Sequence, residues 1–434
     1  PAALQIIRVE TLSGVANPGA STLSGPGFVA SGQVFRVIVE ARDSQGDTTP
    51  NFGLESTAEA VRVISDGLVA PAGGRHGSTN DVLGGATFSR TGPGQFQSTA
   101  VAFDEVGIIS LHAELLDGDF LGIGAIPGPS SGEVGRFYPA AFVMSSNSVG
   151  AACNGFVYQD QPALQLSYTL QAHNTSAAVV ENYDTGHYGL GNVATVVRHA
   201  EDNDSGVALN ARLSAGTASW NDGVLIETDV SATFSRALAA DGPFDQLQIG
   251  LSLNDPLDAV DLTGVNMHAA SSGDCAVAGT CDAVMLGSPI IVRYGRLTVL
   301  PGSSSELDNL DVPLLAQYFD GTGFRHHQAD QCSQYQLGAA TLSDYQDALA
   351  AGETTLLAPA VSTALILGGP DPAAPLLLSA PGAGNTGSVL LQLNVPGWLR
   401  YDWLGTGDVD PQGRQSFGLF RGHDRVVFWS ERLD

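Results

Sequence analysis

Four residues near position 330 carry side chains that bind transition metals: His326, His327, Asp330 and Cys332. Imidazole, carboxylate and thiolate groups are the usual ligands of zinc and related ions. Neighbouring residues of a β-strand point to opposite faces, so His326 and His327 would not share one metal on a strand. Cys332 would also be lost as a ligand if it formed a disulfide. We therefore expect no metal here.

Three aspartates near the C-terminal end, Asp402, Asp408 and Asp410, offer the oxygen ligands that Ca²⁺ prefers. Their spacing differs from that of an EF-hand, and Ca²⁺ needs about six to eight oxygen ligands. Exposed turn aspartates are also common in any strongly acidic chain. The three residues are calcium candidates, with ordinary surface turns as the alternative, and no other cofactor is expected.

The chain has four cysteines, Cys153, Cys275, Cys281 and Cys332, and none of them forms a C-x-x-C pair. An even number of cysteines in a glycine-rich acidic chain indicates two disulfides and an oxidising compartment. Cys275 and Cys281 share the small-residue segment SGDCAVAGTCDA, so we predict that they pair. That leaves Cys153 to pair with Cys332. The alternative is four buried free thiols.

Sequence motifs for catalysis are missing. There is no G-x-S-x-G nucleophile elbow, and the 45 acidic residues single out no carboxylate pair. We therefore predict that the protein is not an enzyme. Trp220 lies beside the turn at 221–223, where an exposed indole could contact a sugar or a protein partner. The alternative for Trp220 is a packed structural side chain.

The charge of the chain excludes several classes of partner. Its 434 residues include 45 Asp and Glu but only 18 basic residues, all Arg, which gives a formal net charge of −27. A surface this acidic repels nucleic acid and anionic lipid. No apolar run reaches the roughly 18 residues that span a bilayer, so we expect no direct membrane insertion. Because no signal peptide precedes Pro1, we expect a processed protein or a fragment of a longer one.

Short alternating apolar runs predict that β-strands position these residues. Clear examples are 34–41 (VFRVIVEA), 164–172 (LQLSYTLQA) and 389–395 (VLLQLNV). One helix is predicted over 343–351, where Ser343 to Gln346 fit a capping box and Gly352 would end the helix. The fold class is therefore all-β with at most one or two short helices, in sandwiches of the immunoglobulin-like type.

An internal repeat predicts the domain organisation. Residues 35–52 (FRVIVEARDSQGDTTPNF) align with 166–183 (LSYTLQAHNTSAAVVENY) at a constant offset of 131, and 312–324 (VPLLAQYFDGTGF) is a looser third copy. An arginine followed by alternating apolar residues precedes or opens each repeat, at Arg8, Arg136 and Arg296. Repeated units indicate repeated domains.

The boundaries follow from a linker and from the third arginine. A segment rich in Pro, Gly and Ser, 126–132, lies just before Arg136 and is predicted to be a linker. No such segment precedes Arg296, so we expect the second and third domains to be rigidly joined. The prediction is three immunoglobulin-like β-sandwich domains in tandem, with long inserted loops, at 1–134, 135–294 and 295–434.

Several stretches resemble the MshQ family of MSHA (mannose-sensitive haemagglutinin) type IV pilus biogenesis proteins, in its C-terminal region of unknown function. They are DEVGII, GRFYP, VPLLAQY, LSAPG, GNTGSV, WLRYDW and RVVFW, which begin at 104, 135, 312, 378, 384, 398 and 425. The resemblance covers nearly the whole chain and is strongest after 295. Larger members also resemble proteins with a lectin-like sandwich nearer the N-terminus. Residues 404–410 depart from the acidic turn that the family pattern implies, which weakens the calcium interpretation.

The resemblance implies an exported protein, extracellular or at the cell surface, associated with a pilus or the outer membrane. We predict a non-catalytic structural module that is part of, or attached to, a type IV (MSHA-like) pilus or surface filament. The alternative is an adhesin whose loops bind carbohydrate or another surface. Expected partners are pilus or other surface proteins. Self-association is a further option, if the run 424–431 (DRVVFWSE) pairs with a neighbouring chain instead of its own domain.

Overall fold

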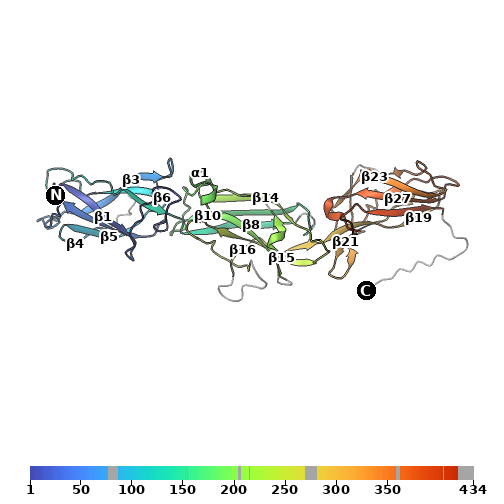
Figure 1. The fold of residues 1–434 in the computed structure, drawn as a ribbon, viewed down its shortest axis with the longest axis horizontal. Coiled ribbons are helices and arrows are strands. Elements are labelled where there is room, and N and C mark those ends of the chain that lie inside the picture. The colour runs from blue at the N-terminus through green and yellow to red at the C-terminus, as the bar shows by residue number, and fades with distance from the viewer. Residues whose placement is uncertain are drawn as a thin grey trace.

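The computed structural model describes residues 1–76, 87–151, 153, 155–203, 207–214, 216–268, 281–357, 362–403 and 405–418. The chain forms three β-sandwich units in an elongated row, with the N-terminus at one end (Figure 1). Within the described residues the one α-helix is α1, Thr185–Tyr188. No helix in that part of the chain has the length and apolar character needed to cross a membrane. The predicted immunoglobulin-like all-β fold is confirmed.

Unit one consists of two sheets that enclose one core. The first sheet has the order β1 (Ala3–Glu10), β2 (Phe35–Arg42), β5 (Gln95–Val101), β4 (Ser89–Gly92), and the second has the order β3 (Val61–Ala70), β6 (Gly107–Leu115), β7 (Glu133–Phe137). Phe137 and Ile126 both pack in this core. Residues 126–132 are therefore a loop inside unit one and not a linker, because the apolar side chains on either side of them belong to the same core.

Unit two repeats this strand order. Its first sheet runs β8 (Ala141–Gly150), β10 (Leu164–His173), β14 (Val224–Phe234), β13 (Leu213–Ser214). Its second sheet runs β12 (Val207–Ala208), β11 (Thr195–Asp202), β15 (Phe244–Asn254), β17 (Ile290–Arg293), β9 (Phe156–Tyr158), with β16 (Val284–Met285) also paired to β15. Strands β3, β6 and β7 of unit one thus correspond to β11, β15 and β17.

Unit three surrounds the third core. One sheet runs β18 (Gly295–Val299), β21 (Leu314–Phe319), β22 (Phe324–His326), and a small one runs β20 (Leu310–Asp311), β26 (Leu377–Leu378), β24 (Leu356–Leu357). The largest runs β19 (Gly302–Ser304), β28 (Gln412–Phe417), β27 (Gly387–Asn394), β23 (Gln334–Asp347), β25 (Ser362–Ala364). Strand β27 is its central strand, as β15 is in unit two.

The three example strands are confirmed as β2, β10 and β27, but the predicted helix is wrong. Strand β23 continues to Asp347, and its Leu342 pairs with Leu391 of β27. Leu342 and Tyr345 also pack against the third core. A partner strand and a core contact outweigh the local capping signal, which is worth only about 1 kcal/mol.

The repeat seen in the sequence is a recurring hairpin. Thr49 donates its N–H to Ala41 O, and 131 residues later Val180 donates to Ala172 O. In unit three His327 donates in the same way to Ala316 O. We call these segments, 41–52, 172–183 and 316–330, the repeated hairpin. The third copy is three residues longer, which explains its weaker sequence match.

Candidate functional site at the joints

The repeated hairpin of unit two lies against unit one. Thr175 N donates to Ser31 O at 3.0 Å, and Asn174 Nδ2 donates to Asp104 O at 2.9 Å. The side-chain oxygen of Asn174, Oδ1, accepts hydrogen bonds from the N–H groups of Ser176 and Ala178, which fixes the turn that presents the hairpin. The first joint is therefore formed by the element that sequence analysis identified as the repeat.

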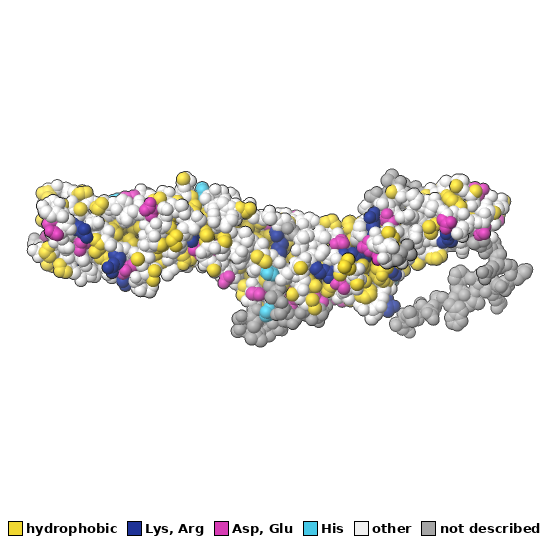
Figure 2. Space-filling model, viewed as in Figure 1, with side chains coloured by type: hydrophobic (Ala, Val, Ile, Leu, Met, Phe, Trp, Pro, Cys, Tyr) yellow, Lys and Arg dark blue, Asp and Glu magenta, His cyan; other side chains and the backbone are white. Residues whose placement is uncertain are grey.

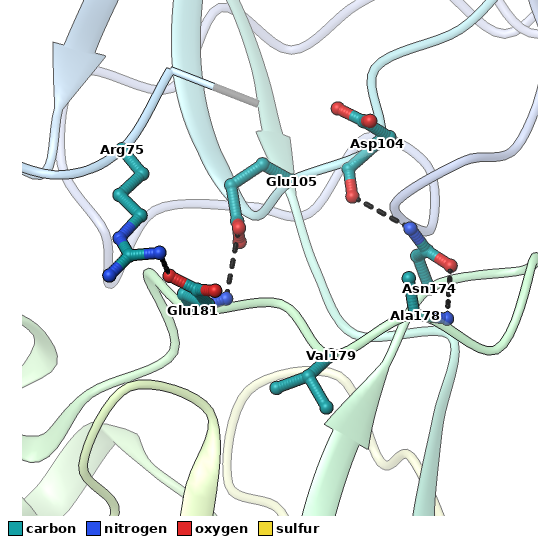
Figure 3. A pocket seen from close by; sticks show the side chains of 7 residues that line it. All are labelled: Arg75, Asp104, Glu105, Asn174, Ala178, Val179 and Glu181. Atoms are coloured by element: carbon teal, nitrogen blue, oxygen red, sulfur yellow. Dashed lines mark hydrogen bonds and ion pairs between the residues drawn. The ribbon is translucent and has the colours of Figure 1, made fainter. Parts of the chain in front are cut away.

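A buried carboxylate lies at the centre of this joint (Figure 3). Glu105 Oε2 accepts from Glu181 N at 2.9 Å, and Oε1 accepts from Asn182 N at 3.2 Å and from Val106 N at 2.8 Å. Burial raises the pKa of Glu105 to about 7, and these backbone N–H groups oppose the rise. Glu105 thus connects the segment just before β6 of unit one to the end of the hairpin.

Glu105 lines a cavity of about 250 Å³ between units one and two. Polar contacts between the two units close the rim of this cavity. Arg75 of unit one forms an ion pair with Glu181. The Asn182 amide exchanges two hydrogen bonds with the backbone of Arg75, at 2.6 and 2.7 Å. Figure 3 shows Arg75 and Glu105 pointing toward Glu181 from the side of unit one. This geometry is suited to joining two domains.

A buried ion pair closes the other side of the first joint. Arg136 of β7 donates two hydrogen bonds to the Asp258 carboxylate, at 2.7 and 2.6 Å, and Arg136 Nε donates to Gly25 O at 2.8 Å. Arg136 is 1% exposed, and Asp258 lies in the loop that follows β15. A guanidinium group that bonds a carboxylate through two parallel hydrogen bonds also fixes its orientation.

The second joint contains a disulfide between Cys153 of unit two and Cys332 of unit three, with Cα atoms 5.8 Å apart. Beside it Tyr158 Oη donates to Asp330 Oδ2 at 2.9 Å. The Tyr158 hydroxyl also lies 2.6 Å from His327 Nδ1. Burial lowers the pKa of His327 to about 4, so its ring is neutral at pH 7. Because the Tyr158 O–H is directed to Asp330, the hydroxyl oxygen is left to accept a hydrogen bond, which requires the tautomer of His327 with the proton on Nδ1. His327 and Asp330 belong to the repeated hairpin of unit three.

Arginine again bridges the units at the second joint. Arg236 of unit two donates to Arg400 O and Gly295 O, both at 2.9 Å. Its guanidinium carbon lies 3.8 Å from the centre of the Tyr294 ring. Arg236 also forms an ion pair with Asp408, with 3.4 Å between a guanidinium nitrogen and a carboxylate oxygen. Asp408 follows the central strand β27, just as Asp258 follows β15.

Comparison with known sequences identifies the family. Residues 1–99, 105–282 and 293–432 match, in that order, the second, third and fourth domains of DUF6701. The chain belongs to the DUF6701 family. No curated protein matches it. The match to the family's third domain begins at 105, before β6, although β6 pairs with β3 of unit one and β7 pairs with β6.

Solved structures with a similar arrangement are only distantly related to this DUF6701 chain. Yersinia pseudotuberculosis InvD is 10% identical and has a TM-score of 0.27, over 94% of this chain and 96% of that one. The adhesin InvE of the same species is 14% identical, with a TM-score of 0.24 over 60% of each chain. The I9–I11 tandem of titin is 6% identical, with a TM-score of 0.23 over 89% and 93%. Values this low support no inference about function.

The cluster of potential metal ligands near residue 330 surrounds the disulfide of the second joint. Among the described residues, Cys153, Asp330 and Cys332 form the one group of three or more potential ligands. Both sulfurs belong to the disulfide, so they are not available to a metal. His327 is buried next to this group, whereas His326 is exposed.

The calcium candidates have separate partners. Asp402 Oδ1 accepts from Thr406 N at 2.8 Å, and Asp410 Oδ1 accepts from Arg400 Nε at 3.0 Å and from Val395 N at 3.1 Å. Asp408 pairs with Arg236. Asp410 and Asp408 thus each lie beside an arginine whose charge balances their own. The structure does not bring the three carboxylates together as one group of ligands.

The predicted ligand contact at Trp220 is wrong. Trp220 is 2% exposed, and its ring packs against Phe142 and Tyr183 at centroid distances of 5.1 and 5.2 Å. Its Nε1 donates to Ala194 O at 2.7 Å. The turn after Trp220 is exposed, but the indole points inward because a full aromatic core lies beneath it. A tryptophan beside a turn does not show which way the ring points.

The remaining predictions fall partly outside the described residues. Cys281 is disulfide-bonded, and Cys275, its predicted partner, lies outside the described residues. The run 424–431, considered above as a donated strand, also lies outside them. Sequence analysis missed Asp258 and Arg75, and it included Glu105 only as part of the stretch DEVGII. It noticed Arg136 only as a marker of the repeat, and no local motif indicated its partner 122 residues away.

Proposed function

We propose that this DUF6701 chain is a non-catalytic, exported structural module. It is a rigid rod of three β-sandwich domains, of which the first extends through β7 to Phe137 and not only to 134, and it is part of, or attached to, a type IV (MSHA-like) pilus or cell-surface filament. The observation that supports this proposal best is that both joints are closed by buried polar groups and, at the second, by a disulfide. The disulfide also supports an oxidising compartment outside the cytoplasm.

The physical reason concerns the cost of bending. Flexible domain linkers are exposed and make few contacts with the domains they connect. Here a bend at the first joint would separate Arg136 from Asp258, whose side chains are 1% and 6% exposed. Breaking such a pair leaves two charges without partners, which costs several kcal/mol. The rod therefore transmits force and orientation between its ends, which is what a filament component requires.

One feature favours an adhesin as the second candidate. A cavity of about 500 Å³ at the second joint is lined by Gln161, Gln334, Asn394 and Trp398. Amide side chains beside an indole ring are suited to hydrogen bonding and stacking with a sugar. Carbohydrate would then bind between units two and three, and not at Trp220.

Two measurements test the proposals. Surface filaments would be sheared from cells that express the tagged protein and then purified, and the tagged protein is expected to copurify with them. Recovery of the protein only in filament-free fractions would contradict attachment to a filament. The purified chain would also be applied to a glycan array with a Trp398→Ala variant as the control. Binding that this variant loses would favour the adhesin.

A further inference from the structure

We propose that the N-terminal face of unit one is a docking surface for a further β-sandwich domain that presents an arginine, namely the first domain of the DUF6701 family. We define this face as the repeated hairpin 41–52, the segment 53–59, the loop 116–125 that follows β6, and Pro1. It lies at the end of the rod farthest from unit three (Figure 1). The inference does not depend on attachment to a filament.

The first argument is the repeated hairpin. In units two and three this hairpin contacts the preceding unit, through Asn174, Glu181 and Asn182 at the first joint and through His327 and Asp330 at the second. In unit one the same hairpin has the same turn, in which Asp43 Oδ1 accepts from Gln45 N and Asp47 N, both at 2.9 Å. Its orientation toward the end of the rod is therefore fixed in the same way.

Equivalent positions differ in exposure as an unoccupied joint would require. Asn182 is 2% exposed because its amide bonds to Arg75 and to Val106 O of the preceding unit. Asn51, 131 residues earlier in the same turn of the repeated hairpin, is exposed. The Asn–aromatic pair is thus present in both units, but in the described chain a preceding unit covers only the asparagine of unit two.

The second argument is the loop that follows the central strand. After β15 this loop presents Asp258 to Arg136, and after β27 it presents Asp408 to Arg236. The corresponding loop of unit one, after β6, carries the exposed residues Asp117 and Asp119. In both joints an arginine of the preceding unit meets an aspartate of this loop. By the same arrangement the missing partner of unit one would present an arginine.

The loops of units one and two share their backbone geometry. Asp117 Oδ1 accepts from Asp119 N at 3.2 Å, and Asp255 Oδ1 accepts from Leu257 N at 3.2 Å. Four residues after each of these aspartates the chain has a positive φ at a residue other than glycine, 51° at Leu121 and 53° at Ala259. In this alignment Phe120 stands at the position of Asp258, and Asp117 and Asp119 supply the carboxylates of the loop on the near side of it.

Apolar side chains on this face are exposed. Leu121 and Ile123 are 61% and 80% exposed, and Leu54 is 62% exposed. Figure 2 shows hydrophobic side chains on the surface at this end of the rod. They adjoin a cavity of about 470 Å³ lined by Phe52, Phe120 and Pro1, among others. Grouped apolar side chains rimmed by carboxylates are typical of a surface that another protein covers.

The occupant follows from the family and from charge. The three matched domains are the second, third and fourth of DUF6701, so the family also has a first domain. Pro1 lines the cavity of this face, so a segment attached ahead of Pro1 starts here. Glu55, Glu59, Asp117 and Asp119 make the face acidic, and burial together with Asp117 raises the pKa of Glu59. A second copy of this chain, with a net charge of −27, is a poor match for such a face.

Hydrogen–deuterium exchange tests the proposal. The chain would be compared with the same chain extended ahead of Pro1 by a DUF6701 first domain. In the extended protein we expect amides of 43–51 and 116–125 to exchange at least tenfold more slowly, and those of 174–182 to exchange equally in both. The double variant Leu121→Asp/Ile123→Asp should abolish the slowing, whereas Leu238→Asp, at an exposed site in unit two, should leave it intact.

Three results would overturn the proposal. The first is equal exchange of 43–51 and 116–125 in both proteins, provided that unit one is equally protected at β2 and β6. The second is slowing that the double variant does not affect. The third is concentration-dependent slowing in the chain without the first domain, which would assign the face to a second copy. A failure to copurify with filaments would leave these results unchanged.

Discussion

Replacing Arg136 with alanine tests whether a buried ion pair holds the first joint. The Arg136 and Asp258 side chains are 1% and 6% exposed and share two hydrogen bonds of 2.7 and 2.6 Å. Arg136→Ala leaves the Asp258 carboxylate in this site without a counter-charge and leaves Gly25 O without its donor. Removing one partner of such a pair costs about 3–5 kcal/mol. We expect that loss in the free energy that holds units one and two together.

Two control variants distinguish the loss of the ion pair from the general effect of changing a side chain. Arg136→Met/Asp258→Leu removes both charges and keeps most of the volume, so we expect it to recover most of the loss. Arg325→Ala breaks the pair with Asp320, in which the Arg325 side chain is 53% exposed, and should leave the stability almost unchanged. A double-mutant cycle over the two positions then gives the coupling energy.

Two assays would read the result. Hydrogen–deuterium exchange at increasing urea would report the opening free energy of β7 and of the loop after β15, and small-angle scattering would report the shape of the rod. We expect earlier opening and a broader distribution of shapes for Arg136→Ala. If its opening energy stays within about 0.5 kcal/mol of the native value and its scattering is unchanged, the pair does not hold the joint, and the argument for rigidity fails at this position.

Three further predictions concern the joints. Because the pKa of Glu105 is about 7 when folded and 4.5 in its unperturbed state, its contribution to stability is complete below pH 4.5 and is lost as the pH rises through 7. The loss is on the order of 3 kcal/mol. Urea titrations at pH 5 and pH 8 would measure it as a difference in the free energy of unfolding, and Glu105→Gln should reduce that difference. Cys153→Ser/Cys332→Ser opens a loop of 179 residues and should cost about 5 kcal/mol in the chain-entropy model, and an unchanged urea midpoint would contradict this. Tyr158→Phe removes the hydroxyl that donates to the buried Asp330 carboxylate and should lower the stability of unit three by about 1–3 kcal/mol. Unfolding monitored by tryptophan fluorescence would measure the change, and the control Tyr345→Phe should have little effect.

The strands and the repeat were predictable because their signals are local. Alternation of apolar and polar residues in β2 and β10 records which side of the strand faces the core, and this needs no knowledge of the partner strand. The offset of 131 was also readable, since the same hairpin needs the same turn and the same aromatic at its end. Neither the apolar alternation nor the repeat indicated that the hairpin points toward the preceding unit.

The joint residues were not predictable because their partners are distant in the sequence. Glu105 resembles any acidic residue before a strand, and its role depends on N–H groups of Glu181 and Asn182 that lie 76 and 77 residues away. The prediction for Trp220 was wrong for a related reason, because the burial of its ring depends on Phe142 and Tyr183, which are distant in the sequence. The helix expected at 343–351 failed because β27 offers β23 a partner strand that local propensity does not include.

The placement of arginine connects the composition with the shape. The chain has 18 arginines against 45 acidic residues, and Arg75, Arg136 and Arg236 are used to bridge successive units. The excess of acidic over basic residues, a net charge of −27, leaves the surface of the chain acidic. Like-charged surfaces repel each other over about 8 Å at physiological salt, which opposes association of rods side by side. Side-by-side packing of rods is therefore disfavoured relative to the contacts at the joints, where an arginine of one unit meets an aspartate of the next.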